Sequence, residues 1–294
     1  MGRSSGRRLV GRLIVAPSPA TPWIATLAAS LLVSFVCAIV WTAQTPLSAQ
    51  ARTPYRAPRT ADGKPDLNGI WQAMNAAHWD LQGHPAHAGP IPAMGAFGGI
   101  PGGLGVVEGG EIPYQPWALA RKKENADKWL ERDPAVKCYL PGVPRATYMP
   151  FPFQIVQSAD HVLVAYEFAQ ASRTIYINGK DESPLDTWMG WSNARWDGET
   201  LVVDVRGIND QTWFDAAGNF HSEALHVVER YTRTGPDHLM YEATIDDAKV
   251  FTRPWKIRMP LYRRIEEHAQ LLEFKCVEFA EELMYGHLKK QTGK

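Results

Sequence analysis

A succession of short strand-like segments separated by turn residues, running from Phe151 to Val277, limits what this chain can fold into more than any other feature of its sequence. The turns Asn178-Gly179 and Asp197-Gly198 carry the residue pairs that hairpins prefer. Consecutive hairpins without intervening helices make neighbouring strands antiparallel, and such a sheet must pack on a second sheet or close on itself. We therefore predict a mainly β fold, an antiparallel meander that forms a barrel or strongly curved sheet in preference to a two-sheet sandwich.

The expected strands cover residues 66–72, 153–157, 161–168, 173–177, 193–196, 200–205, 225–232, 238–245, 255–262 and 270–277. One helix is predicted before the meander, over residues 116–132, because Pro116 suits a first helical turn and Trp117 and Trp129 mark an apolar side. A second helix is expected at the C-terminus, over residues 278–290.

The first 51 residues predict export. Four arginines and no acidic residue precede an apolar run of 18 residues at 24–41, and the small residues Ala49 and Ala51 fit cleavage after Ala51. The run is close to the about 20 residues that span a bilayer, so an uncleaved anchor attached to the inner membrane through residues 24–41 is the alternative. Because basic residues stay inside, both versions give a periplasmic or secreted protein. Residues 52–65, rich in Pro, Arg and Thr, are expected to be a tether, and residues 66–294 a single β-rich domain.

Charge and cysteine content restrict the partners and the compartment of this domain. The chain has 31 basic and 31 acidic side chains, and removal of the four N-terminal arginines leaves 27 against 31. A mildly acidic domain does not favour nucleic acid, which requires a basic face. Cys138 and Cys276 are the two cysteines after the export segment, and an even pair in an oxidising compartment predicts a disulfide. Two buried thiols that never meet are the alternative.

Several stretches carry a family resemblance: residues 62–71 (DGKPDLNGIW), 138–157, 196–203 (WDGETLVV) and 209–233. They resemble a large family of exported proteins of unknown function that is abundant in soil bacteria, and the resemblance covers nearly all of the chain after the export segment. The early Gly69-Ile70-Trp71, the long meander and the C-terminal helix are also similar to the layout of lipocalin-type barrels. The resemblance implies export and a common fold, but no activity.

The densest group of polar and aromatic residues lies at 209–226, between two predicted strands, where binding groups usually sit on a rigid scaffold. A histidine oriented by a carboxylate makes a general acid–base pair. The same residue types bind metals, although no metal-ligand spacing occurs here. A third interpretation is an ordinary structural loop. The catalytic candidates are His221, His226, Asp215 and Glu223, and the ligand-binding candidates are Trp213, Phe214, Phe220 and, from the loop described next, Trp79.

The loop at residues 73–113 is the second candidate region. It is rich in Gly and Pro and contains His78, His84 and His87 beside Trp79 and Asp80. Loops of this length are usually functional or disordered. Histidine-rich tracts can bind metal, but a flap that folds over the barrel mouth is the interpretation we favour. We expect no metal, because no recognised metal-ligand spacing occurs, and no cofactor, because no phosphate-binding glycine loop precedes a helix. Nucleophile signatures are absent from the sequence as well.

The sequence therefore leaves three functions open. The first is an extracytoplasmic barrel that binds a small apolar or aromatic molecule, indicated by the meander, the long loops and the 11 Trp, 10 Tyr and 10 Phe residues. The second is a cofactor-free hydrolase, lyase or isomerase that uses a His–carboxylate pair. The third is a structural protein of the envelope. In the first two cases we expect His221, Glu223 or His226 to line the largest cavity.

Overall fold

The structure is a computed structural model that describes residues 55–278 and His287. The export segment at 1–51 therefore lies outside the described residues, and so does nearly all of the helix expected at 278–290. Residues 55–278 belong to one compact unit. Within the part of the chain that is described, no helix combines the length and apolar character needed to cross a membrane.

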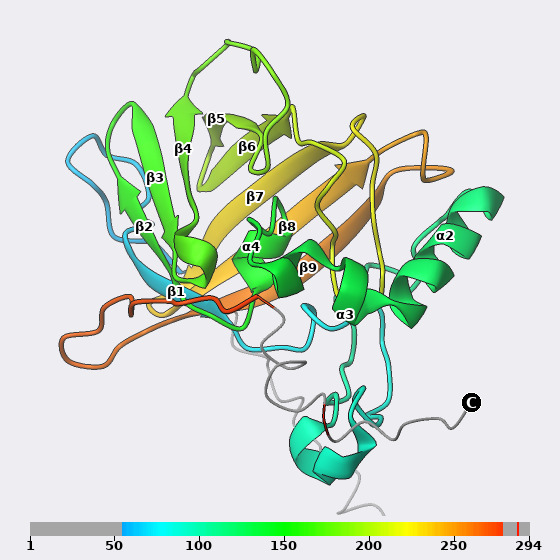
Figure 1. The fold of residues 1–294 in the computed structure, drawn as a ribbon. Coiled ribbons are helices and arrows are strands. Elements are labelled where there is room, and N and C mark those ends of the chain that lie inside the picture. Colours follow the sequence, from blue (N-terminus) through cyan, green and yellow to red (C-terminus); the bar gives the residue numbers. More distant parts are fainter. Residues whose placement is uncertain (1–54, 279–286, 288–294) are drawn as a thin grey trace, which may run out of the picture. The chain divides into compact units, whose positions relative to one another are not determined.

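Nine strands close into a barrel in the order of the sequence, which confirms the predicted mainly β fold (Figure 1). The barrel closes because the first strand pairs antiparallel with the last, with Gln72 opposite Tyr262. The strands are β1 (Gly69–Ala73), β2 (Phe153–Gln157), β3 (His161–Tyr166), β4 (Ser172–Ile177), β5 (Trp191–Asp197), β6 (Thr200–Arg206), β7 (His226–Gly235), β8 (His238–Asp246) and β9 (Trp255–Arg263).

One strand pair is not antiparallel as predicted. β4 and β5 run parallel, with Ile175 opposite Ser192. A type I′ hairpin turn needs positive φ at both central residues, and at the Asn178-Gly179 turn only Asn178 has it, with φ 59°. The chain instead makes an excursion through residues 178–190 and returns toward the other end of the barrel before β5 begins. A parallel pair requires such a crossover connection.

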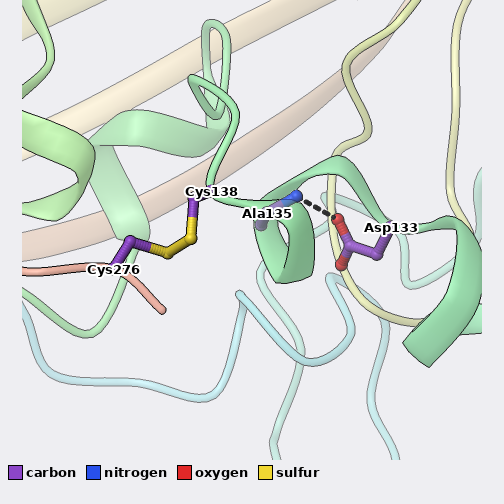
Figure 2. Close-up of a disulfide and its surroundings, with 4 residues drawn as sticks. All are labelled: Asp133, Ala135, Cys138 and Cys276. Atoms are coloured by element: carbon purple, nitrogen blue, oxygen red, sulfur yellow. Dashed lines mark hydrogen bonds between the residues drawn. A yellow bond between two sulfur atoms is a disulfide. The ribbon is translucent and has the colours of Figure 1, made fainter. Parts of the chain in front are cut away.

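The predicted strand at 270–277 is wrong as well. This segment makes no strand, because the β1–β9 pairing already closes the barrel and leaves no edge to extend. Phe274 packs instead against Phe151 and Phe168, with ring centroids 5.0 Å apart in both contacts. The segment is tied to the rest by a disulfide between Cys138 and Cys276, whose Cα atoms are 5.7 Å apart (Figure 2). The predicted disulfide is thereby confirmed.

The interior of the barrel is filled by side chains. Burial alternates along the strands, as in β9, because successive side chains point to opposite faces of a sheet. Val203, Val227, Leu239 and Ile257 are among the inward residues with no exposed surface. The interior is thus a packed hydrophobic core.

Helices and long loops gather at one end of the barrel. The strand registers place the end of β1, the end of β6, the start of β7 and the start of β9 at the same end, so residues 74–115 and 207–225 leave the barrel there. The helix predicted at 116–132 is confirmed, but it breaks at Lys128. The helices are η1 (Pro92–Gly98), α2 (Pro116–Asp127), α3 (Trp129–Arg132), η2 (Pro134–Lys137), α4 (Arg145–Tyr148) and η3 (Phe168–Gln170). In Figure 1 α4 is drawn in front of the barrel strands, and all four of its residues are buried.

Candidate functional site

The four catalytic candidates of segment 209–226 do not meet in one cluster. Asp215 is fully buried and its carboxylate accepts hydrogen bonds from the backbone N–H of Leu81 at 2.8 Å and from Nδ2 of Asn219 at 2.6 Å. It therefore joins the loop at 73–113 to the loop at 209–225. Burial raises the pKa of Asp215 to about 7, and the charge of nearby Asp80 adds to the increase.

His221 is also buried, and both of its ring nitrogens have partners. Nε2 lies 2.6 Å from the hydroxyl of Thr212, and Nδ1 lies 2.8 Å from the carbonyl oxygen of Ser222. Burial lowers its pKa, because desolvation disfavours the charged imidazole. The ring faces the aromatic face of Phe214 at 5.3 Å between centroids. These contacts fit a structural histidine, held neutral beneath the surface.

Glu223 and His226 bond to partners other than those of Asp215 and His221. Glu223 is exposed and pairs with Lys249. His226 points outward from the start of β7, and its Nε2 lies 2.8 Å from Oδ2 of Asp204 on the neighbouring strand β6. None of His221, Glu223 and His226, which were expected to line the largest cavity, lines any of the five pockets described for the structure.

The four predicted aromatic ligand contacts separate into two groups. Trp213 and Phe214 are buried, and Phe214 packs edge-on against Trp255 of β9. Phe220 is half-buried against the core and stacks on Tyr114. Only Trp79 lines a pocket. The first three therefore anchor the 209–225 loop onto the end of the barrel.

Trp79 belongs to a crevice at the loop end of the barrel, made of two adjoining pockets that share Trp79, Ile100 and Trp129. We call it the loop crevice. The rings of Trp79 and Trp129 meet edge to face, with centroids 5.6 Å apart. The two pockets have volumes of about 240 and 190 Å³. The remaining lining residues are Asp80, His84, His87, Pro90, Ile91, Met94, Phe97, Gly98, Gly99, Ala126, Ala216 and Ala217.

The larger pocket of the loop crevice is its polar end. Asp80 accepts a hydrogen bond from the backbone N–H of Gln82 through Oδ1. The ring nitrogens of His84 lie 2.9 and 3.1 Å from the carbonyl oxygens of Gln82 and Pro101, and this fixes the imidazole in the wall. His87 is exposed, with Nδ1 3.0 Å from the carbonyl oxygen of Ala88. The polar groups that line this pocket are thus the Asp80 carboxylate and the two imidazole rings.

The smaller pocket is apolar and lies between α3 and the short helix η1. Ile91, Met94 and Phe97 line it together with the two shared tryptophans. The side chain of Phe97 is 84% exposed at the edge of this pocket. A pocket lined mainly by apolar and aromatic side chains is the usual form of a ligand-binding site.

The sequence did not identify Trp129, Met94, Phe97 or Ile100 as site residues. Trp129 was placed on the apolar side of the predicted helix, and the break at Lys128 turns it toward the loop at 73–113. Met94 and Phe97 lie in η1, which the sequence did not predict. The run Ile91-Pro92 is the available signal, since Pro favours a first helical turn.

The inside of the barrel contains a polar cluster that the sequence did not predict. Arg173 of β4 and Glu229 of β7 are buried, with Nη2 and Oε2 2.7 Å apart. The hydroxyls of Tyr231 and Tyr241 both donate to Oε1 of Glu229, at 3.0 and 2.7 Å. Burial and the charge of Glu229 raise the pKa of both tyrosines well above the ordinary value. None of the five pockets is lined by these residues, so the cluster is enclosed.

The histidine-rich loop does not assemble a metal site among the residues described, since these hold no group of three or more His, Cys, Asp or Glu side chains with suitable geometry. His78 is separate from His84 and His87. Its ring is mostly buried near Arg145, and desolvation, with the Arg145 charge, lowers its pKa to about 4.

No protein-family model and no curated protein matches the chain. Among solved structures, the chain is similar to a mutant of the fluorescent protein UnaG, with 16% sequence identity and a TM-score of 0.25. That similarity covers 39% of this chain and 72% of the UnaG chain. At these values it supports no argument about function.

Proposed function

We propose that the protein binds a small, largely apolar or aromatic molecule in the loop crevice, outside the cytoplasm. The observation that carries the proposal is the Trp79–Trp129 pair, which stands between an apolar pocket and a polar one. A ligand with an aromatic or apolar body and one polar end fits this arrangement. Its body would lie against Met94 and Phe97, and its polar end would face Asp80, His84 and His87.

The size and composition of the crevice support this proposal. Ligand pockets are mostly apolar clefts with a few polar groups that fix orientation, and they usually reach volumes of about 300–1,000 Å³. The two adjoining pockets together fall at the lower end of that range. The tryptophans supply large contact areas at low entropic cost, because each has only two side-chain torsions to fix.

The compartment follows from separate observations. Disulfides such as Cys138–Cys276 form and persist mainly in oxidising compartments. The basic and apolar N-terminal segment indicates export, and so does the resemblance to exported proteins of soil bacteria. We infer a periplasmic or secreted protein, with attachment to the inner membrane through residues 24–41 as the alternative.

The hydrolase, lyase or isomerase alternative has no comparable observation in its favour. Such an enzyme needs a histidine and a carboxylate that face a common pocket. Asp215 and His221 are each enclosed by partners within the chain, and Glu223 is on the surface with Lys249. His226 does pair with a carboxylate, that of Asp204, but the histidine lines none of the five pockets.

Binding of anilinonaphthalene sulfonate, an aromatic probe with one anionic group, tests the proposal by the increase in its fluorescence. Trp129→Ala removes one side of the aromatic pair, and we expect it to weaken binding about tenfold. Trp117→Ala is the matched control, since Trp117 lies on the neighbouring helix α2, is 56% exposed and lines neither pocket. Circular dichroism establishes that both variants fold.

Equal affinity of the two variants would place the probe elsewhere and contradict the proposal. No binding to the unaltered protein would favour the structural role in the envelope. A probe that protects His84 and His87 from carboxyethylation by diethyl pyrocarbonate, while leaving the exposed His268 reactive, would locate the polar end as proposed.

A further inference from the structure

A second pocket lies on the outer wall of the barrel, where the 178–190 excursion folds back over strands β5 and β6. We call it the outer-wall pocket. Its volume is about 400 Å³, larger than either half of the loop crevice. No residue is common to the two sites. It is lined by Lys180, Asp181, Glu182, Ser183, Asp186, Trp191, Asn193, Asp204, Arg206 and Gly207.

The floor of this pocket is set by the strand registers. Trp191 lies opposite Arg206, and Asn193 lies opposite Asp204, in the antiparallel β5–β6 pair. Since residues two apart share a face, these four side chains point outward together. Tyr176 of β4 stacks on Trp191 with centroids 5.1 Å apart and extends the aromatic surface.

The roof is fixed onto the floor by hydrogen bonds of the excursion. Asn193 donates through Nδ2 to the carbonyl oxygen of Asp181 at 2.7 Å. The backbone N–H of Thr187 donates to the carbonyl oxygen of Gly207, and that of Asn209 donates back to Thr187. These bonds hold the excursion, which carries Glu182 and Asp186, against the strands.

The charges of the lining favour a cationic ligand. Four carboxylates stand against two cationic side chains, Lys180 and Arg206. Arg206 is occupied by Asp204, through an Nε–Oδ1 contact of 3.0 Å, and Asp204 also accepts from His226. Asp204 is thus neutralised and held in place, with His226 as a positioning residue. The pocket keeps the negative charge of Asp181, Glu182 and Asp186, partly offset by Lys180.

We propose that the outer-wall pocket binds a small amine with a ring that packs on Trp191, of which a 2-amino sugar is a simple case. Its ammonium group would lie among the carboxylates of the excursion and against the Trp191 indole, since cations are attracted to aromatic faces. Indole rings also pack well against the apolar faces of such a ring.

The test is a titration of the full-length protein with glucosamine, followed by nitrogen–proton correlation NMR at the indole N–H of Trp191 and by calorimetry. The indole signal is assigned by its loss in Trp191→Phe. N-acetylglucosamine is the matched neutral probe and glucuronate the anionic one. We expect glucosamine to shift the Trp191 signal in a saturable way and the other two to shift it much less.

The double variant Glu182→Gln, Asp186→Asn should weaken glucosamine binding about fivefold, since both residues are exposed and each contributes a modest charge interaction. The control is Asp197→Asn, Glu199→Gln, which removes the same charge from the exposed β5–β6 turn outside the pocket and should leave binding unchanged. If Trp191→Phe fails to fold, calorimetry on these two double variants decides alone. Equal binding of glucosamine and N-acetylglucosamine, equal effects of the double variants, or no saturable binding would each overturn the proposal.

Discussion

Inside the barrel, Arg173 and Glu229 neutralise one another and two tyrosine hydroxyls donate to the carboxylate, whereas at the loop end Asp80, His84 and His87 line an open crevice. Both regions combine charged and aromatic side chains. They differ in where the polar groups find partners: within the chain in the interior, and partly toward solvent in the crevice. The barrel interior is a filled scaffold, and on such scaffolds binding groups usually lie in the loops.

The largest expected effect comes from breaking the enclosed pair. Glu229→Gln leaves the buried guanidinium of Arg173 without a counter-charge, and we expect the free energy of unfolding to fall by about 3–5 kcal/mol. Urea unfolding measures the loss. The double variant Arg173→Met, Glu229→Leu should recover only part of it, because apolar residues can replace a buried pair but leave the hydroxyls of Tyr231 and Tyr241 without their acceptor. A loss below about 1 kcal/mol for Glu229→Gln would mean that water reaches the interior, and the contrast with the crevice would disappear.

The second effect concerns the disulfide that ties residue 276 to the segment entering the loop end (Figure 2). The two cysteines are 138 residues apart. For such a loop the chain-entropy model gives about 5 kcal/mol, and removal of a native disulfide typically costs about 2–5 kcal/mol. Cys138→Ser should therefore lower the free energy of unfolding within that range, and the same loss should appear in the unaltered protein under reducing conditions. Unchanged stability after reduction would show that packing of Phe274 alone holds the segment.

Asp215 links the two regions, because it lies below the loop crevice yet is as enclosed as Glu229. Its pKa is raised from 3.8 to about 7 in the folded chain. The folded state therefore holds the proton more tightly, and this stabilisation is complete below pH 3.8 and lost as the pH rises through about 7.

Asp215→Asn has no charge to bury at any pH. From pH 4 to pH 8 its stability relative to the unaltered protein should rise by a few kcal/mol, as measured by urea unfolding at several pH values. His78, whose pKa is lowered to about 4, acts in the opposite direction, gaining stability as the pH rises. It is present in both proteins and cancels in the comparison. A constant difference across this range would show that Asp215 is ionised throughout.

The strands could be predicted from the sequence because their signals are local. The β2–β3 and β5–β6 hairpins lie where alternation and the turns at residues 158–160 and 197–198 place them. The parallel β4–β5 pair could not be predicted in this way. The Asn178-Gly179 signal describes two residues, while the direction of β5 depends on the closure of the whole barrel.

The candidate sites were predictable only in part. Trp79 stood out in its loop, but its partner Trp129 is 50 residues away and lies in another predicted element. Asp215 was singled out as a reactive carboxylate, whereas its role depends on the backbone N–H of Leu81, 134 residues away. Residue type and spacing identify polar groups in a loop, but whether such a group faces a pocket or a partner is decided by tertiary contacts.

The smallest effects separate the two histidines that the sequence treated alike. His221→Ala removes a buried ring whose two nitrogens contact Thr212 and Ser222, so we expect a loss of about 1–3 kcal/mol in the free energy of unfolding. His226→Ala removes a partly exposed contact with Asp204 and should cost less than about 0.5 kcal/mol. Binding of anilinonaphthalene sulfonate should be the same in His226→Ala as in the unaltered protein, because His226 lines neither half of the loop crevice. If His221→Ala were as stable as His226→Ala yet lost probe binding, His221 would belong to the binding site, and the division between an enclosed scaffold and an open crevice would have to be redrawn around it.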